Sequence, residues 1–324
     1  MHPIAAILDH FIIYQYSLIL ALAAAAGIFC FLGCSAYLRI PVHRASATAF
    51  FALFLSLILS RLVYWYGRPD SFASLSHALR ATSSEHFALA GTFAGCLFSA
   101  LLSGKQESIR MNLDCMSVAG CVSLALGRLG CFFTSGNRGP VMVQLTRFPW
   151  SYPVTDISGN PEYRFATFFF QATVAAVLGI FLAVIFFRQK HRPGDVAILF
   201  VLFYSASQII LDSTRYDALY LRSNGFVSMV QVLSAVGLAG VLILLCIRAA
   251  KVLGLQKWMI PVWIAFAALF GGVGYMEYYV QRHGREAAFS YAIMGSCLAC
   301  MVALGMILWH HSRVSVNAKT KYPV

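Results

Sequence analysis

Arg128 stands at the end of an otherwise apolar stretch and between two glycines, in the run G-R-L-G-C-F-F at residues 127–133. Bringing a guanidinium into hydrocarbon costs about 2.5–3.5 kcal/mol at mid-membrane and less at the edge, so such a residue usually has a partner or a task. The fork of N–H donors on an arginine matches the oxygens of a phosphate group. We therefore treat Arg128 as a candidate contact for an anionic headgroup, the alternative being an arginine that snorkels from a helix end.

Several other polar side chains are expected near the same depth in a membrane. Arg61 ends one apolar run, Arg215 follows another, His86 begins a third and Tyr16 lies in the first turns of the first run. Arginines at one depth on several helices would suit an anionic phosphate. The alternative is that helix ends are simply where arginines are tolerated.

The composition predicts the elements that must position these side chains. Hydrophobic residues make up 60% of the 324 residues, charged residues 11%, and long apolar runs carry few charges. Such a chain is a polytopic membrane protein, and runs of this length indicate helices rather than a β-barrel. The sequence predicts an all-α fold with nine spans, at 12–36, 46–66, 86–103, 113–133, 166–187, 196–213, 226–247, 259–280 and 288–309.

The distribution of basic residues predicts the orientation of the spans. With the N-terminus outside, thirteen Lys and Arg residues fall on the cytoplasmic side and nine outside, and all six lysines are inside. This bias favours an outside N-terminus and a cytoplasmic C-terminus. The net charge of +12 is spread over short loops without a patch of stacking aromatics, so we expect contacts with anionic membrane lipids and none with nucleic acid.

The connection over 134–164 is long and rich in glycine and proline. These residues exclude a continuous helix, and loops of this length are often functional. Trp150 and Tyr152 would suit the membrane interface, so we expect a flap on the outer leaflet.

The nine cysteines fall almost wholly inside apolar runs, where they behave as small hydrophobes. Cys297 and Cys300 form a C-x-x-C pair, but in the middle of a span. We therefore expect neither a metal site nor a cofactor.

The order of the motifs resembles that of the prolipoprotein diacylglyceryl transferase family. The family signature G-R-x-G-N-F-x-N-x-E is matched by G-R-L-G-C-F-F-T-S-G at 127–136. Asp114 precedes Arg128 by fourteen residues, as in the family, and the resemblance covers about residues 10–250. Further pieces in the family's order are Y-Q-Y-S-L at 14–18, S-R-L-V-Y at 60–64, P-G at 193–194, D-S-T-R at 212–215 and S-M-V-Q-V-L-S at 228–234.

This resemblance implies a bacterial inner-membrane transferase. Such enzymes move the diacylglyceryl group of phosphatidylglycerol onto the lipobox cysteine of a prolipoprotein, so the expected partners are phosphatidylglycerol or another anionic phospholipid and a prolipoprotein. It also implies a seven-span core over 1–250, followed over 251–324 by two additional spans and a basic tail. Carried over residue by residue, the catalytic candidates are Arg128, His86 and Arg215, and the substrate-binding candidates are Tyr16, Arg61, Gly130, Cys131, Asp212 and Gln231.

The departures from the family pattern leave the activity open. Cys131, Thr134 and Gly136 stand where the signature has two asparagines and a glutamate, and Leu89 stands in place of the family's histidine. His86 lies one helical turn earlier and could supply the imidazole base, or it could be an interfacial histidine. Cys131 beside Arg128 could instead be a covalent nucleophile. The alternatives to an enzyme are a non-catalytic relative that binds phospholipid or lipoprotein and, with less support, a transporter.

Overall fold

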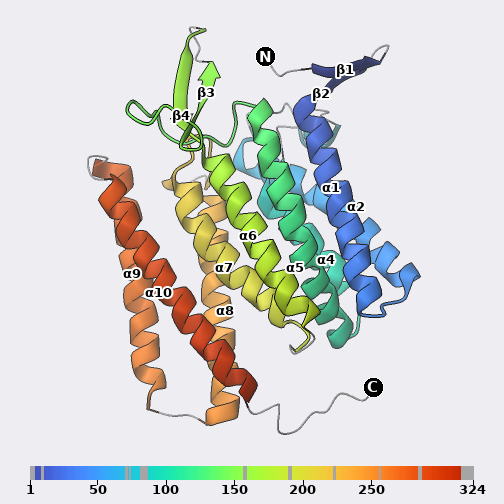
Figure 1. Cartoon of the computed structure of the whole chain (residues 1–324), viewed down its shortest axis with the longest axis vertical. Coiled ribbons are helices and arrows are strands. Elements are labelled where there is room, and N and C mark those ends of the chain that lie inside the picture. The colour runs from blue at the N-terminus through green and yellow to red at the C-terminus, as the bar shows by residue number, and fades with distance from the viewer. Residues whose placement is uncertain are drawn as a thin grey trace. The chain divides into compact units, whose positions relative to one another are not determined.

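A computed structural model describes residues 4–8, 11–69, 72, 74–80, 87–155, 159–188, 192–221, 224–254, 257–283 and 287–314. The chain is built from long helices, and eight of those described are long and apolar enough to cross a membrane (Figure 1). The predicted class, an all-α polytopic membrane protein, is confirmed. The helices are α1 (Gln15–Tyr37), α2 (Val42–Gly67), α3 (Leu75–Arg80), α4 (Leu89–Leu101), α5 (Gln106–Leu129), α6 (Thr167–Phe187), α7 (Asp195–Ser213), α8 (Met229–Leu253), α9 (Met259–His283) and α10 (Ala287–Val314).

The third predicted span differs most from the structure. The apolar run over 86–103 forms only the 13-residue helix α4, which covers about 20 Å at 1.5 Å per residue. Phe87 and Ala88 are not helical, and the backbone N–H of Ala88 donates to the carbonyl of Ser60, 3.1 Å away. Helix α4 therefore begins beside Ser60, about two turns before α2 ends. The prediction of a full-length span over 86–103 is corrected.

By its contacts the chain forms two compact units. Unit 1 comprises Met1–Phe200 and Thr214–Val230, and unit 2 comprises Val201–Ser213 and Gln231–Val324. The boundary predicted near residue 250 marks where the family resemblance ends, and it stays a prediction.

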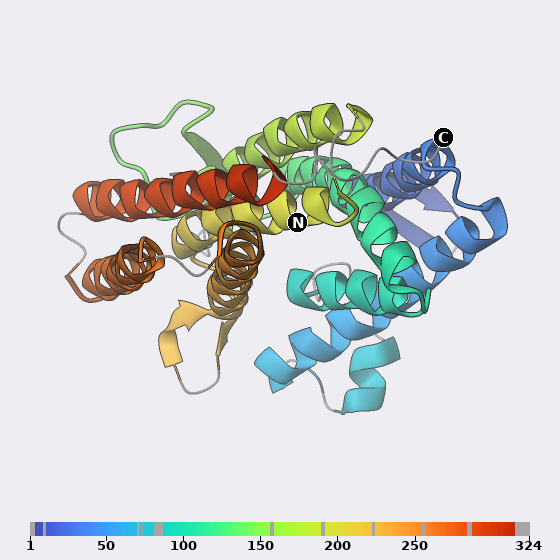
Figure 2. The same ribbon diagram turned by 90° about the horizontal axis from the view of Figure 1, so that it is seen from below.

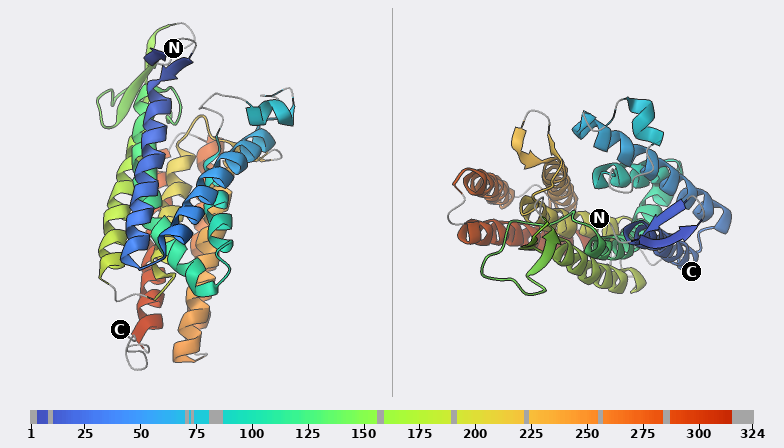
Figure 3. Two further views of the ribbon diagram at one scale, coloured as in Figure 1. Left: turned by 90° about the vertical axis from the view of Figure 1, so that its right-hand side faces the viewer. Right: turned by 90° about the horizontal axis from the view of Figure 1, so that it is seen from above.

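In unit 1, α5 packs against α1 and against α6, while α2 pairs with α4. A Cβ atom on Gly91 would collide with the backbone of Leu59 and Ser60, and one on Gly95 would collide with the backbone of Ser56. Small residues four apart let two membrane helices approach closely. Figures 2 and 3 show the α2–α4 pair leaning away from α1 toward the end that carries α3.

Beside the helices, the described part of the chain contains three short antiparallel hairpins. They are β1 (Ile4–Leu8) with β2 (Phe11–Tyr14), β3 (Ser151–Thr155) with β4 (Pro161–Phe165), and β5 (Tyr220–Leu221) with β6 (Asn224–Ser228). The first two lie at the end of unit 1 where α1 begins and α5 ends (Figure 1). The connection over 134–164, expected to be an irregular flap, thus contains a hairpin in which Tyr152 is paired with Arg164.

Unit 2 packs the second part of α7 with α8, α9 and α10. Its fully buried side chains include Leu202, Leu242 and Met301. A Cβ on Gly305 of α10 would lie 2.9 Å from Leu202 of α7, so the close fit of these two helices depends on that glycine.

Candidate functional site

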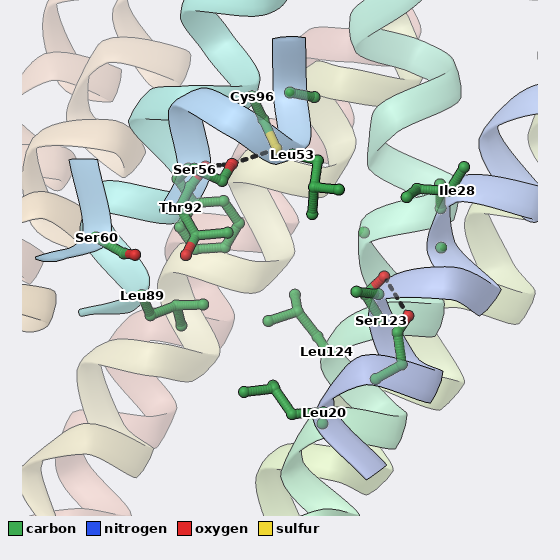
Figure 4. Close-up of a pocket in the computed structure, with 18 of the residues that line it drawn as sticks. Leu20, Ile28, Leu53, Ser56, Ser60, Leu89, Thr92, Cys96, Ser123 and Leu124 are labelled. Carbon is green, nitrogen blue, oxygen red and sulfur yellow. Dashed lines mark hydrogen bonds between the residues drawn. The ribbon is translucent and has the colours of Figure 1, made fainter. Parts of the chain in front are cut away.

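An apolar pocket of unit 1 lies between the pair α1–α5 and the pair α2–α4. Its volume is about 380 Å³, and most of its lining is aliphatic or aromatic. Ser56, Ser60, Thr92 and Ser123 add hydroxyl groups. Three of these already donate to backbone carbonyls: Ser56 to Thr92, Ser60 to Leu57 and Ser123 to Ala23. In Figure 4 side chains of α2 and α4 face those of α1 and α5 across the pocket: Leu53, Ser56, Leu89 and Thr92 against Leu20, Ile28 and Leu124.

One end of this pocket is polar. Tyr16 from the first turn of α1 lines it together with Arg128 from the end of α5 and Cys131 just after that helix. The opposite end reaches Phe31, fifteen residues along α1, or about 22 Å at 1.5 Å per residue. The pocket is therefore long and apolar enough to bind a hydrocarbon chain, and its polar end suits a polar group at one end of that chain.

Arg128 is the one charged residue among the described residues that line this pocket. It is half-buried, and within the described part of the chain it makes no hydrogen bond or ion pair. A guanidinium whose N–H donors are not used by described residues, at the polar end of an apolar pocket, is suited to bind an anionic ligand.

Gly130 and Cys131, which follow α5, lie where the end of that helix packs against α1. A Cβ on Gly130 would lie 3.2 Å from Ile19 and 3.3 Å from Tyr16, whereas one on Gly127 would meet nothing closer than 3.8 Å. Of the two glycines that flank Arg128, only Gly130 is thus required by packing. Cys131 follows in a short 3-10 helix (Gly130–Phe133) and is 5% exposed.

Arg61 is buried beside the pocket but is not among its lining residues. Its guanidinium lies 4.0 Å from the centre of the Phe87 ring, and that ring lines the pocket. The structure thus places Arg61 behind an aromatic side chain, in a cation–π contact that offsets part of the cost of its burial.

Arg215 lies outside the pocket lining and forms an ion pair with Asp217, whose Oδ1 is 3.1 Å from its Nε. The other oxygen of Asp217 accepts a hydrogen bond of 2.8 Å from the backbone N–H of Asn137. Burial alone would raise the pKa of Asp217, but the charge and hydrogen bond of Arg215 and the Asn137 N–H hold it below its ordinary value. Asp217 is therefore ionised at neutral pH and is a poor base.

The sequence analysis missed Arg138. Among Arg128, Arg138 and Arg215 it is the most deeply buried, with 1% of its surface exposed. It donates to the carbonyls of Cys131 and Thr134 at 2.9 and 3.0 Å, and its guanidinium lies over the rings of Tyr152 and Phe168. Burial lowers the pKa of its guanidinium from the ordinary value. The G-N-R-G-P run at 136–140 was the available pointer, since it places an arginine and an amide among glycine and proline in a long connection.

Four charges act on the thiol of Cys131, those of Arg128, Arg215, Arg138 and Asp217. Residues from the end of α5, from the connection after it and from the segment after α7 are thus gathered at the polar end of the pocket. Three of the four charges are positive, so the cluster favours an anionic group.

The remaining predicted site residues are placed elsewhere or not described. Asp212 and Gln231 belong to unit 2, are buried there, and are not among the residues that line the pocket. The side-chain amide of Gln231 donates to the carbonyl of Ile209 at 3.2 Å. His86 lies outside the described residues.

Asp114, whose spacing to Arg128 supported the family resemblance, has a structural role in unit 1. Its two oxygens accept hydrogen bonds from the backbone N–H groups of Gly194 and Ala197, at 2.7 and 2.8 Å. These groups belong to the beginning of α7, where unpaired N–H groups need an acceptor. Asp114 is about 21 Å along α5 from Arg128, so it holds a helix end and does not contact the polar end of the pocket.

Comparison with known proteins gives a consistent result. The family model described as prolipoprotein diacylglyceryl transferase matches residues 3–247. Three relatives named phosphatidylglycerol–prolipoprotein diacylglyceryl transferase come from Clostridium botulinum, Acaryochloris marina and Shouchella clausii. They are 25%, 25% and 22% identical to this chain, over 74%, 70% and 70% of its length and 95%, 83% and 84% of theirs.

Proposed function

The chain belongs to the prolipoprotein diacylglyceryl transferase family, and on this premise we propose that it moves a diacylglyceryl group from phosphatidylglycerol to the cysteine of a prolipoprotein. The observation that carries the proposal is the apolar pocket that ends at Arg128, a cation that makes no hydrogen bond or ion pair among the described residues. In this proposal an acyl chain of the lipid occupies the pocket between α1, α2, α4 and α5. The phosphate of the same lipid lies against Arg128.

The reaction requires a thiolate and a stabilised leaving group. A base takes the proton of the prolipoprotein cysteine, the sulfur forms a bond to the glyceryl carbon, and the bond from that carbon to the phosphate oxygen breaks. Glycerol phosphate leaves with the electron pair. We assign the stabilisation of its charge to Arg128, with Arg215 adding positive potential, because groups aimed at developing charge often supply the largest catalytic contribution.

The base is assigned to His86, the candidate imidazole of the sequence analysis. Asp217 is unsuited to that role because its pKa lies below the ordinary carboxyl value. Tyr16 and Gly130 are assigned to shaping the polar end of the pocket, where the ring of Tyr16 lies against Gly130. Asp212 and Gln231 stay predicted substrate-binding residues.

One contact favours an active enzyme over a non-catalytic relative. Gly136 stands where the family signature has a glutamate, and a Cβ built on Gly136 would lie 3.4 Å from Oδ2 of Asp217. The carboxylate of Asp217 thus reaches the space into which a side chain at position 136 would project. We infer that Asp217 supplies the negative charge that the glycine removes.

We also propose an orientation with the N-terminus outside and the C-terminus in the cytoplasm of a bacterial inner membrane. The polar end of the pocket then faces the outer leaflet, where a secreted prolipoprotein is reached. Alkaline phosphatase fused at Gly159 should be active and a fluorescent protein fused at Gly254 should fluoresce. The reverse pattern would contradict the orientation.

The function is tested by complementing a bacterial strain depleted of its own diacylglyceryl transferase. The wild-type chain should restore growth and lipoprotein processing, whereas Arg128→Ala and His86→Ala should not. Arg147→Ala is the matched control, because Arg147 is an exposed arginine that does not line the pocket. If the wild-type chain is expressed and binds phosphatidylglycerol but fails to rescue, the non-catalytic alternative replaces the transferase.

A further inference from the structure

A second pocket lies at the opposite end of unit 1 from Arg128. Its volume is about 490 Å³, and it is formed where α1 is connected to α2 and where α4 is connected to α5. Asn112 of α5 lines it, sixteen residues before Arg128, or about 24 Å along the helix. The two pockets are therefore separate sites near opposite faces of the membrane.

The lining of this second pocket is positively charged. Arg39, Arg44 and Lys105 line it, and no acidic residue is among the described residues that do. None of the three cations forms an ion pair or a side-chain hydrogen bond within the described part of the chain. Three cations without counter-charges around one cavity create a site for an anion.

Arg39 is placed there at a backbone cost. Its φ is 57°, in the left-handed region, and its N–H donates to the carbonyl of Ala36 as the chain leaves α1. At such a helix end glycine is the preferred residue, and a side chain costs about 1–2 kcal/mol. An arginine at this position brings its charge to the pocket in spite of that cost.

Asn112 provides a second polar feature. Its side chain is 4% exposed, lines the pocket, and has an Oδ1 without a hydrogen-bond partner among the described residues. A buried acceptor without a donor costs about 1–3 kcal/mol. A ligand that carries a hydroxyl or ammonium group beside its anionic group would satisfy it.

The apolar part of the lining indicates that the ligand is amphiphilic. Ile40, Phe51 and Leu102 line the pocket beside the cations, and Phe51 and Leu102 are also 43% and 64% exposed. A soluble anion would gain nothing from these side chains. A lipid would place its first methylene groups against them.

We propose that this second pocket binds the phosphate headgroup of an anionic phospholipid in the leaflet opposite the transfer site. The phosphate contacts Arg39, Arg44 and Lys105, and a headgroup hydroxyl donates to Asn112. Basic pockets between helices on the cytoplasmic side of membrane proteins recognise such headgroups. The proposal does not depend on the transferase activity.

The full-length protein in phosphatidylcholine nanodiscs doped with phosphatidylglycerol provides the test, with retained phosphatidylglycerol molecules counted by native mass spectrometry. Arg39→Gln/Arg44→Gln/Lys105→Gln should retain one molecule fewer than the wild type and bind phosphatidylglycerol about tenfold or more weakly. Arg188→Gln/Arg248→Gln/Lys251→Gln makes the same charge change outside the pocket and should retain the wild-type number. Equal losses in both triple variants would overturn the proposal.

Arg39→Gly separates lipid binding from folding. Glycine relieves the left-handed conformation, so this variant should unfold at the same or a higher temperature than the wild type while phosphatidylglycerol retention falls. Unchanged retention in this variant would contradict the proposal. So would displacement of the lipid by soluble glycerol phosphate at equal affinity, since that result assigns the pocket to a soluble anion.

Discussion

At the scale of single residues, the polar end of the first pocket depends on three arginines with different surroundings. Arg128 makes no hydrogen bond or ion pair among the described residues, Arg215 is paired with Asp217, and Arg138 holds two carbonyls of the turn that contains Cys131. A guanidinium paired with a fixed acceptor organises the site, while one without a partner is available to a ligand. We therefore distinguish a binding role for Arg128 from a positioning role for Arg138.

The positioning role of Arg138 predicts a strong effect of a conservative change. Lysine cannot keep both carbonyl hydrogen bonds and the contact with Tyr152 and Phe168, so Arg138→Lys should destabilise the protein by about 2–3 kcal/mol. Thermal unfolding in detergent measures the effect, with the exposed Arg147→Lys as the control. Equal unfolding temperatures for the two variants would show that Arg138 does not hold the turn.

The pair of Arg215 and Asp217 predicts a dependence of stability on pH. Burial opposes the charge of Asp217, but its partners hold its pKa below the ordinary 3.8. A carboxyl whose pKa is lower in the folded state stabilises the protein above the unfolded pKa, and this stabilisation is lost as the pH falls through the folded value. Asp217→Asn should thus cost about 1 kcal/mol at pH 7, and the difference from the wild type should shrink below pH 3.8. A difference that stays constant from pH 7 to pH 3 would contradict this assignment.

Sequence reasoning found Arg128 but not Arg138 or Asp217. The end of an apolar run is visible in a single stretch, because an arginine there stands out against its neighbours. Arg138 and Asp217 reach the site through the pairing of the connection after α5 with the segment after α7, as in the hydrogen bond from Asn137 to Asp217. Contacts between segments 80 residues apart leave no local pattern in the sequence.

At the scale of elements, the approach of α4 to α2 depends on two glycines. Any side chain on Gly91 or Gly95 would enter the backbone of α2, whereas a Cβ on Gly33 of α1 would meet nothing within 4 Å. This pairing forms one wall of the first pocket. The wall is therefore set by backbone contact rather than by interlocking side chains.

Alanine substitutions at Gly95 and Gly33 should have different effects. Gly95→Ala should destabilise the protein by about 1–3 kcal/mol and weaken phosphatidylglycerol binding, because the added methyl pushes α4 away from α2. Gly33→Ala should leave both properties unchanged or slightly improve stability. Thermal unfolding and lipid retention measure the two variants, and similar results for both would show that close packing of α2 and α4 is not required.

The helices were predictable because the hydrocarbon core of a membrane demands about 20 apolar residues for each span. The shortness of α4 was not, because the apolar run over 86–103 continues through Phe87 and Ala88, which are not helical. The hairpin β3–β4 was also missed, since its strands contain Pro153 and Pro161. Those prolines read as turn residues although each lies in a strand of a two-stranded sheet, where every strand is an edge.

At the scale of the whole molecule, the family match covers residues 3–247 and the last two helices lie beyond it. The polar end of the first pocket and the second pocket both belong to unit 1, within the matched part. We therefore assign the chemistry to unit 1 and predict that it depends on Arg128.

The most direct test of that claim is the release of glycerol phosphate by purified protein in liposomes that contain phosphatidylglycerol, with a lipobox peptide as acceptor. The wild type should release one glycerol phosphate for each diacylglyceryl group that appears on the peptide. Arg128→Gln should lower the rate about 100-fold or more while the protein stays folded. A wild-type protein that retains phosphatidylglycerol but releases no glycerol phosphate, or an Arg128→Gln variant as fast as the wild type, would contradict the account.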